Sequence, residues 1–182
     1  FFKTNKKKSI IFNKQTISLI KSLIKKINFN DFKTQKVLRD DKIGLLASEI
    51  AKIQVIRKFL NLKQLDFVRD SLKNKKGCIL DGRDIGTVIL PDADIKFFVT
   101  ASAEVRAKRR LLENKSTNLH INKQKCTFND YLIKIIERDE NDYNRKNSPL
   151  KKASDAIEID TSLLSPKEVE EIAINKIYKK NT

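Results

Sequence analysis

Apolar residues return every three or four positions from residue 40 or 41 onward, and the pattern continues toward residue 72. The first of these positions are Ile43, Leu46, Ile50, Ile53, Ile56 and Leu60. This spacing is typical of an amphipathic helix, which we expect to end at the Lys-Lys-Gly sequence of residues 75–77. Because no Gly or Pro lies between Ser48 and Arg57, the helix should be straight there and should carry these two side chains on opposite faces.

The first 37 residues carry a weaker pattern. They are rich in Lys and contain three short apolar runs, Ile10–Phe12, Ile17–Ile20 and Ile27–Phe29. A small hairpin and a helix followed by a strand both fit these runs, so the pattern leaves the fold of this segment open.

Three later apolar runs predict short strands: Cys78–Leu80, Ile95–Thr100 and Ala156–Asp160. Helical segments alternate with them, one capped by Ser102, one from about residue 129 to 147, and one begun by Ser165, Pro166 and Glu168. No hairpin turn joins the strands, so the order predicts an α/β fold with a parallel sheet flanked by helices. Residues 114–127 have no period, and we expect them to form a mobile loop.

The net charge of +16 raises the possibility of nucleic-acid binding. Much of the excess lies in residues 1–38, which hold ten Lys and one acidic residue. The chain is also rich in Ile and Asn, as a general drift in composition would produce. We therefore expect a solvated surface rather than a nucleic-acid interface.

The length of 182 residues suits one compact domain. Cys78 and Cys126 lie far apart without other ligands nearby, so neither a structural zinc site nor a disulfide framework is expected. No charge-free run is long enough to span a bilayer, and we expect a cytoplasmic protein. Since the sequence begins at Phe1 and contains no Met, we also expect that the start of the natural chain is missing.

Arginine is more informative than lysine in this chain. Only nine Arg occur, all between Arg39 and Arg145. In a chain that uses Lys for most positive charges, such a set suggests recognition of carboxylate or phosphate by the planar guanidinium group. The strongest cluster is Asp81-Gly82-Arg83-Asp84-Ile85-Gly86, which follows a predicted strand, where α/β proteins bind their ligands. A turn with a local ion pair fits the same residues.

Two further clusters lie on predicted helices. Arg138, Asp142 and Arg145 are spaced to share one face, as a ligand site or a solvated ladder of ion pairs would require. A second basic stripe precedes the aperiodic loop and contains Arg106, Arg109 and Arg110. That stripe fits a lid that closes over an anion, and it fits an ordinary surface helix equally well.

Together these stretches resemble bacterial cytidylate kinase, the (d)CMP kinase of the nucleoside monophosphate kinase group. The matching segments are Ala47–Arg57, Asp81–Phe98, Ala101–Arg110, Glu137–Leu150 and Ser154–Thr161. The resemblance implies a P-loop NTPase-like parallel sheet flanked by helices. It also implies that residues 1–38 belong to the insert that binds the nucleoside monophosphate, and that residues 39–182 form the kinase core with a lid around residues 106–128.

The resemblance further implies transfer of the γ-phosphoryl group of ATP, with Mg²⁺, to CMP or dCMP. Contacts to cytosine would come from Ser48, Arg57 and Asp84, and contacts to the acceptor phosphate from Arg83, Arg138 and Arg145. Asp142 would bind the sugar hydroxyl, while Arg106 and Arg110 would lie in the lid over the ATP phosphates. The helix would then have to break between Ser48 and Arg57. The resemblance implies a monomer that binds the nucleotides CMP or dCMP and ATP. It implies no nucleic-acid or membrane partner.

The sequence departs from the family at the phosphate loop. The family opens with a strand and a glycine-rich loop ending in Gly-Lys, whereas this sequence has four Gly and no GxxxxGK motif. We therefore expect a fold that lacks the first strand and phosphate loop, and a chain that is inactive by itself. A non-catalytic protein that binds cytidine nucleotides is the alternative. A basic nucleic-acid-binding protein is a third hypothesis. The arginines disfavour it, because they follow the pattern of the kinase family.

Overall fold

The computed structural model describes residues 13–26, 41–74, 77–116, 126–145 and 148–180. The chain divides into two compact units, one up to Ile79 and one from Leu80 onward, and each is described by itself. None of the helices in these ranges has both the length and the apolar character needed to span a bilayer.

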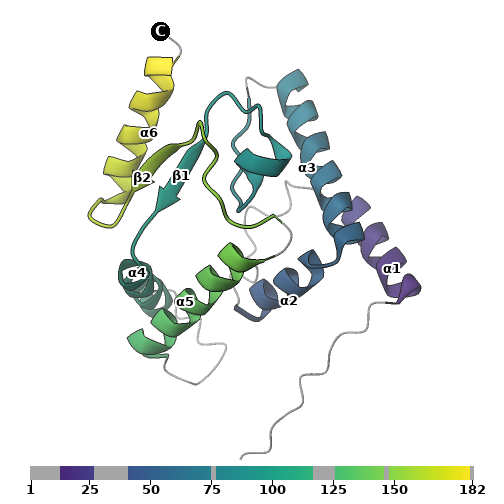
Figure 1. The fold of residues 1–182 in the computed structure, drawn as a ribbon, viewed down its shortest axis with the longest axis horizontal. Helices are drawn as coiled ribbons and strands as arrows, with labels where there is room; N and C mark the ends of the chain where they lie inside the picture. The colour runs from purple at the N-terminus through teal and green to yellow at the C-terminus, as the bar shows by residue number, and fades with distance from the viewer. Residues whose placement is uncertain (1–12, 27–40, 75–76, 117–125, 146–147, 181–182) are drawn as a thin grey trace, which may run out of the picture. The chain divides into compact units, whose positions relative to one another are not determined.

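The described residues of the first unit form three helices: α1 (Lys14–Lys25), α2 (Asp41–Ala51) and α3 (Gln54–Asn74) (Figure 1). The N-terminus of α1 is capped by Asn13, whose side-chain oxygen accepts a hydrogen bond from the Thr16 amide at 2.8 Å. Both α1 and α2 pack against α3. Ile24, Ile56 and Val68 are buried in this unit.

The expected single straight helix is interrupted at Lys52 and Ile53. Their amides bond to carbonyls three residues back, at 3.2 and 3.1 Å, which tightens the end of α2. The Arg57 Nε then donates to the Ala51 carbonyl at 2.9 Å, satisfying a backbone group that the break exposes. The prediction of a straight helix was wrong, and the break implied by the family resemblance is confirmed.

In the part of the second unit that the structure describes, two strands pair in parallel, β1 (Phe97–Thr100) and β2 (Ile157–Asp160). Phe97 pairs with Ile157 and Thr100 with Asp160, so the strands are in register over four residues. Figure 1 shows α6 (Pro166–Lys180) alongside the strands, while α4 (Ala103–Ser116) and α5 (Phe128–Asn144) pack on each other beyond the end to which β1 points. This arrangement confirms the predicted α/β class.

The starts of these helices follow the local sequence. The Ser102 hydroxyl accepts from the Val105 amide at 3.3 Å at the start of α4. Thr127 and Asp130 form a capping box before α5, and Ser165 and Glu168 exchange the same pair of bonds at α6, at 3.3 and 2.7 Å. The hydrogen bonds from Ser165 lower the pKa of the Glu168 carboxyl.

Two local predictions were wrong. Cys78–Leu80 is not a strand, because among the residues that the structure describes only β1 and β2 pair. Ile79 is 95% exposed there. The expected loop begins too early, since α4 runs to Ser116, and residues 117–125 of that loop lie outside the described ranges. The division into an insert and a core at residue 38 stays a prediction.

Candidate functional site

The segment that precedes β1 holds the first predicted cluster. Residues 85–89 form one π-helical turn, in which the Asp84 carbonyl accepts from the Ile89 amide at 3.3 Å and the Ile85 carbonyl from the Leu90 amide at 2.7 Å. A Cβ at Gly82 would lie 2.9 Å from Cγ1 of Ile85, and one at Gly86 would lie 3.2 Å from Cδ of Lys96. A side chain at either glycine would press on the neighbouring side chain, so the backbone approaches Ile85 and Lys96 closely here. Asp84 is buried beside an exposed Arg83.

Arg83 and Asp142 join this segment to helix α5. The Arg83 Nε donates to Asp142 Oδ2 at 2.8 Å, and Arg145 Nη1 lies 3.6 Å from Oδ1 of the same carboxylate. The Asp142 side chain is only 17% exposed, so one carboxylate is held between two guanidinium groups. Three of the predicted site residues are thus brought together.

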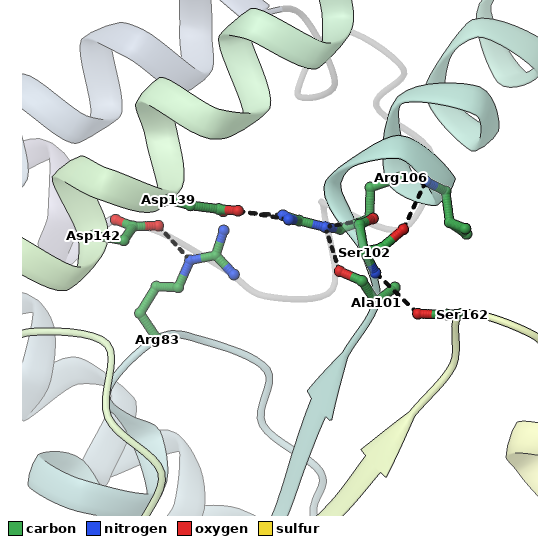
Figure 2. Close-up of polar contacts among 8 residues, drawn as sticks. Arg83, Ala101, Ser102, Arg106, Asp139, Asp142 and Ser162 are labelled. Carbon is green, nitrogen blue, oxygen red and sulfur yellow. Dashed lines mark hydrogen bonds and ion pairs between the residues drawn. The ribbon is translucent and has the colours of Figure 1, made fainter.

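A second pair of the same kind lies one helical turn away. Both terminal nitrogens of Arg106 donate to the Asp139 carboxylate, at 2.9 and 2.5 Å, and its Nε donates to the Ala101 carbonyl at 2.9 Å. The hydrogen bond to Asp139 raises the pKa of Arg106. Figure 2 shows Arg83 and Arg106 reaching Asp142 and Asp139 on one helix. The sequence alone gave no role to Asp139, because its partner lies 33 positions away.

The other predicted arginines lie apart from this pair of contacts. Arg109 fastens the segment after β2, donating to the Thr161 carbonyl at 2.5 Å and to its hydroxyl at 3.1 Å. Arg110 lies 3.4 Å from Glu113 on its own helix, and Arg138 is exposed on α5. The roles expected for Arg110 and Arg138 stay predictions.

Ser48 and Arg57 belong to the first unit. Ser48 lies in α2, and Arg57 lies in the first turn of α3 with its Nε on the Ala51 carbonyl. Asp84 belongs to the second unit, so the cytosine site expected from these three residues is not assembled within either unit. That site stays a prediction.

A cavity of about 270 Å³ lies between residues 81–87 and strand β1. Arg106, Asp139 and Tyr143 complete one part of its wall, and Lys96 lies on another. The charged side chains that line it are Asp81, Arg83, Lys96, Arg106, Asp139 and Lys151. Three of these cations are paired with carboxylates: Arg83 with Asp142, Lys96 with Asp155 and Arg106 with Asp139.

The described parts of the chain hold no group of three or more His, Cys, Asp or Glu residues that could bind a metal ion. These residues therefore do not fit a metal site formed by protein alone. A Mg²⁺ ion that acts in phosphoryl transfer is often bound largely through the substrate phosphates.

Comparison with known proteins gives a consistent result. The family model described as cytidylate kinase matches residues 3–179. A cytidylate kinase of Fervidobacterium nodosum is 40% identical over 161 residues, covering 84% of this chain and 69% of the relative. One from Clostridium botulinum is 41% identical, covering 90% and 75%. One from Mesorhizobium japonicum is 49% identical, covering 69% and 54%.

Proposed function

Because the chain belongs to the cytidylate kinase family, we propose that it provides the CMP or dCMP site of a cytoplasmic kinase that forms CDP or dCDP from ATP. The observation that carries the proposal is the Asp142 carboxylate, held between Arg83 and Arg145. The buried Asp84 lies next to Arg83 in the chain. Guanidinium groups at the end of a parallel sheet suit a nucleotide phosphate, and a neighbouring carboxylate suits a hydroxyl or amine donor.

Recognition of cytosine would depend on Asp84, with Ser48 and Arg57 as further contacts. Cytosine presents an exocyclic amine beside ring acceptors, so a carboxylate accepts from the amine while a guanidinium donates to the acceptors. Uracil has a carbonyl in place of the amine, and a carboxylate facing it would lose a hydrogen bond and meet a like partial charge. Asp84 would thereby select cytidine over uridine nucleotides.

Arg83, Arg138 and Arg145 would bind the acceptor phosphate, and Asp142 would accept from the sugar hydroxyl. In the structure, the Nε of Arg83 donates the hydrogen bond to Asp142, at 2.8 Å. A guanidinium has further N–H donors on its terminal nitrogens, so Arg83 could keep this bond and still bind phosphate. Asp142 would then act as ligand and as orienting partner at once.

Transfer to an acceptor phosphate requires little proton chemistry. The acceptor phosphate is already ionised at neutral pH. The enzyme therefore accelerates the transfer by aligning the two substrates and by neutralising charge on the transferring phosphoryl group. Arg106 and Arg110 would serve the ATP phosphates. No described cluster fits Mg²⁺, so we assign it no protein ligands and derive no step through it.

Titration of the chain with CMP, dCMP, UMP and AMP by calorimetry tests the acceptor site. We expect saturable binding of CMP or dCMP that is at least about tenfold tighter than binding of UMP, as the loss of one charge-assisted hydrogen bond implies. Equal affinity for all four nucleotides, or no binding, would contradict the proposal. Steeply salt-dependent binding of any polyanion would instead favour a nucleic-acid-binding protein.

Binding of cytidine nucleotides without transfer is the alternative to this proposal. Formation of ADP in the presence of ATP, Mg²⁺ and CMP separates the two functions. Our expectation that this chain alone shows no transfer stays a prediction until that assay is made.

A further inference from the structure

The proposed site does not use Lys96, whose side chain is largely covered. It directly precedes β1, and its side chain is only 8% exposed. Its ammonium group donates to both oxygens of Asp155, at 2.9 and 2.7 Å, and to the Pro91 carbonyl. An ammonium group has three hydrogens to donate, so these three acceptors satisfy it fully. Lys96 is therefore unsuited to bind an incoming phosphate although it lines the cavity.

The stem of Lys96 supports the segment that carries Arg83 and Asp84. A Cβ at position 86 would lie 3.2 Å from Cδ and 3.5 Å from Cγ of Lys96, so the Gly86 backbone lies directly against the stem. The ammonium group then holds the end of the same segment through the Pro91 carbonyl. The Lys96 side chain thus contacts both residue 86 and residue 91.

The other end of this connection is the sheet. The Lys96 carbonyl accepts from the Ile157 amide at 2.9 Å, next to the first pair of the β1–β2 register. Asp155 lies just before β2, and its bond to Lys96 lowers the pKa of its carboxyl. Lys96 and Asp155 together tie residues 86–91 to the start of both strands.

We propose that Lys96, held by Asp155, is a positioning residue for the nucleotide site. It fixes the distance between residues 81–91 and strand β1. This distance determines whether the Arg83 guanidinium reaches Asp142, 59 positions away. This proposal rests on the proposed function in one respect only, namely that Arg83 and Asp84 contact the nucleotide.

Hydrogen exchange followed by mass spectrometry tests the proposal on the full chain. Lys96→Met keeps the length of the stem and removes the charge, and Asp155→Asn weakens the anchor while leaving the lysine in place. We expect the Val88, Ile89 and Leu90 amides, which bond to the Asp84 and Ile85 carbonyls, to exchange about tenfold faster in Lys96→Met, as loss of a charge-assisted hydrogen bond implies. Asp155→Asn should give a smaller increase at the same amides.

Lys152→Met is the matched control, because Lys152 is paired with Glu158 at 2.8 Å but is 41% exposed and is not part of the cavity wall. It should leave exchange at residues 88–90 unchanged. CMP affinity should fall about tenfold in Lys96→Met and remain at the wild-type value in Lys152→Met. Lys96→Arg, which retains a cation that can reach Asp155, should recover part of both losses.

Several results would overturn the proposal. Unchanged exchange at residues 88–90 in Lys96→Met would do so, and so would an equal increase throughout β2 and α5, which indicates a general loss of stability. If Lys96→Met does not fold, unchanged exchange in Asp155→Asn overturns it instead. If the wild-type chain does not bind CMP but exchange at residues 88–90 is faster in Lys96→Met, the proposed function is contradicted. The positioning of residues 81–91 by Lys96 and Asp155 is then still supported.

Discussion

Asp142 on α5 accepts a hydrogen bond at 2.8 Å from Arg83, which lies 59 positions earlier in the chain. The contact joins the segment before β1 to a helix that follows it much later. Arg145 lies 3.6 Å from the other oxygen of the same carboxylate. One acidic side chain therefore contacts two guanidinium groups, and we propose that it orients them toward a bound phosphate.

Replacement of Asp142 tests this arrangement directly. Asp142→Asn should weaken CMP binding by about tenfold, because the variant loses a charge-assisted bond to Arg83 and an acceptor for the sugar hydroxyl. Binding of inorganic phosphate should weaken less than binding of CMP, since both arginines remain and only their orientation by Asp142 is affected. Calorimetric titration with CMP and with inorganic phosphate measures the two changes in affinity separately. Glu140→Gln, on the exposed side of α5, is the control, and an equal loss in the two variants would refute the role of Asp142.

Asp84 should determine the choice of base. Asp84→Ala should reduce the preference for CMP over UMP to nearly one, since the acceptor for the cytosine amine is lost. In a chain supplied with a phosphate loop, the same change should impair CMP transfer much more than ATP binding. Asp92→Asn, an exposed acid in the neighbouring turn, is the control. Unchanged discrimination in Asp84→Ala would remove this residue from the site.

The Arg106–Asp139 pair should contribute to the stability of the second unit. Its side chains are 35% and 27% exposed and make a bidentate contact, so we expect a coupling energy of about 1 kcal/mol. A double-mutant cycle of Arg106→Gln and Asp139→Asn, followed by urea unfolding, measures it. The exposed Arg69–Asp66 pair serves as the control cycle, with an expected coupling of about 0.3 kcal/mol. Equal coupling in the two cycles would contradict this ranking.

The capping box of α6 should make stability depend on pH. Bonds from Ser165 lower the pKa of Glu168 below its ordinary value of 4.5. A lowered pKa in the folded state contributes stability that is present above the unfolded pKa and is lost as the pH falls through the folded value. The difference in melting temperature between the wild type and Glu168→Gln should therefore be largest at neutral pH and should shrink as the pH falls below 4.5. A difference that is constant with pH would contradict the assignment.

Helix starts in the second unit could be predicted from the sequence because their determinants are local. Ser102, Thr127 and Ser165 each bond to an amide three residues ahead, and nothing distant is required. The strand predicted at Cys78–Leu80 failed because a strand also needs a neighbour to bond with, which an apolar run does not reveal. The sheet direction was predictable, since helical connections leave parallel pairing as the natural result.

The break between α2 and α3 could not be predicted from periodicity. Its apolar spacing continues across Lys52 and Ile53 without Gly or Pro, and the break is stabilised by a side chain, Arg57, that bonds back to Ala51. The candidate site was predictable in part for a similar reason. Asp142 and Arg145 share one turn of sequence, whereas Asp139 with Arg106 and Lys96 with Asp155 are matched only by the tertiary fold.

Amide NMR spectra of the chain during titration with CMP and with UMP test the central claim most directly. The account predicts that CMP shifts the resonances of residues 82–86 and 138–145, saturates, and does so at a lower concentration than UMP. Shifts confined to the Lys-rich helix α1, or identical shifts with both nucleotides, would contradict the claim that this chain carries a cytidine nucleotide site.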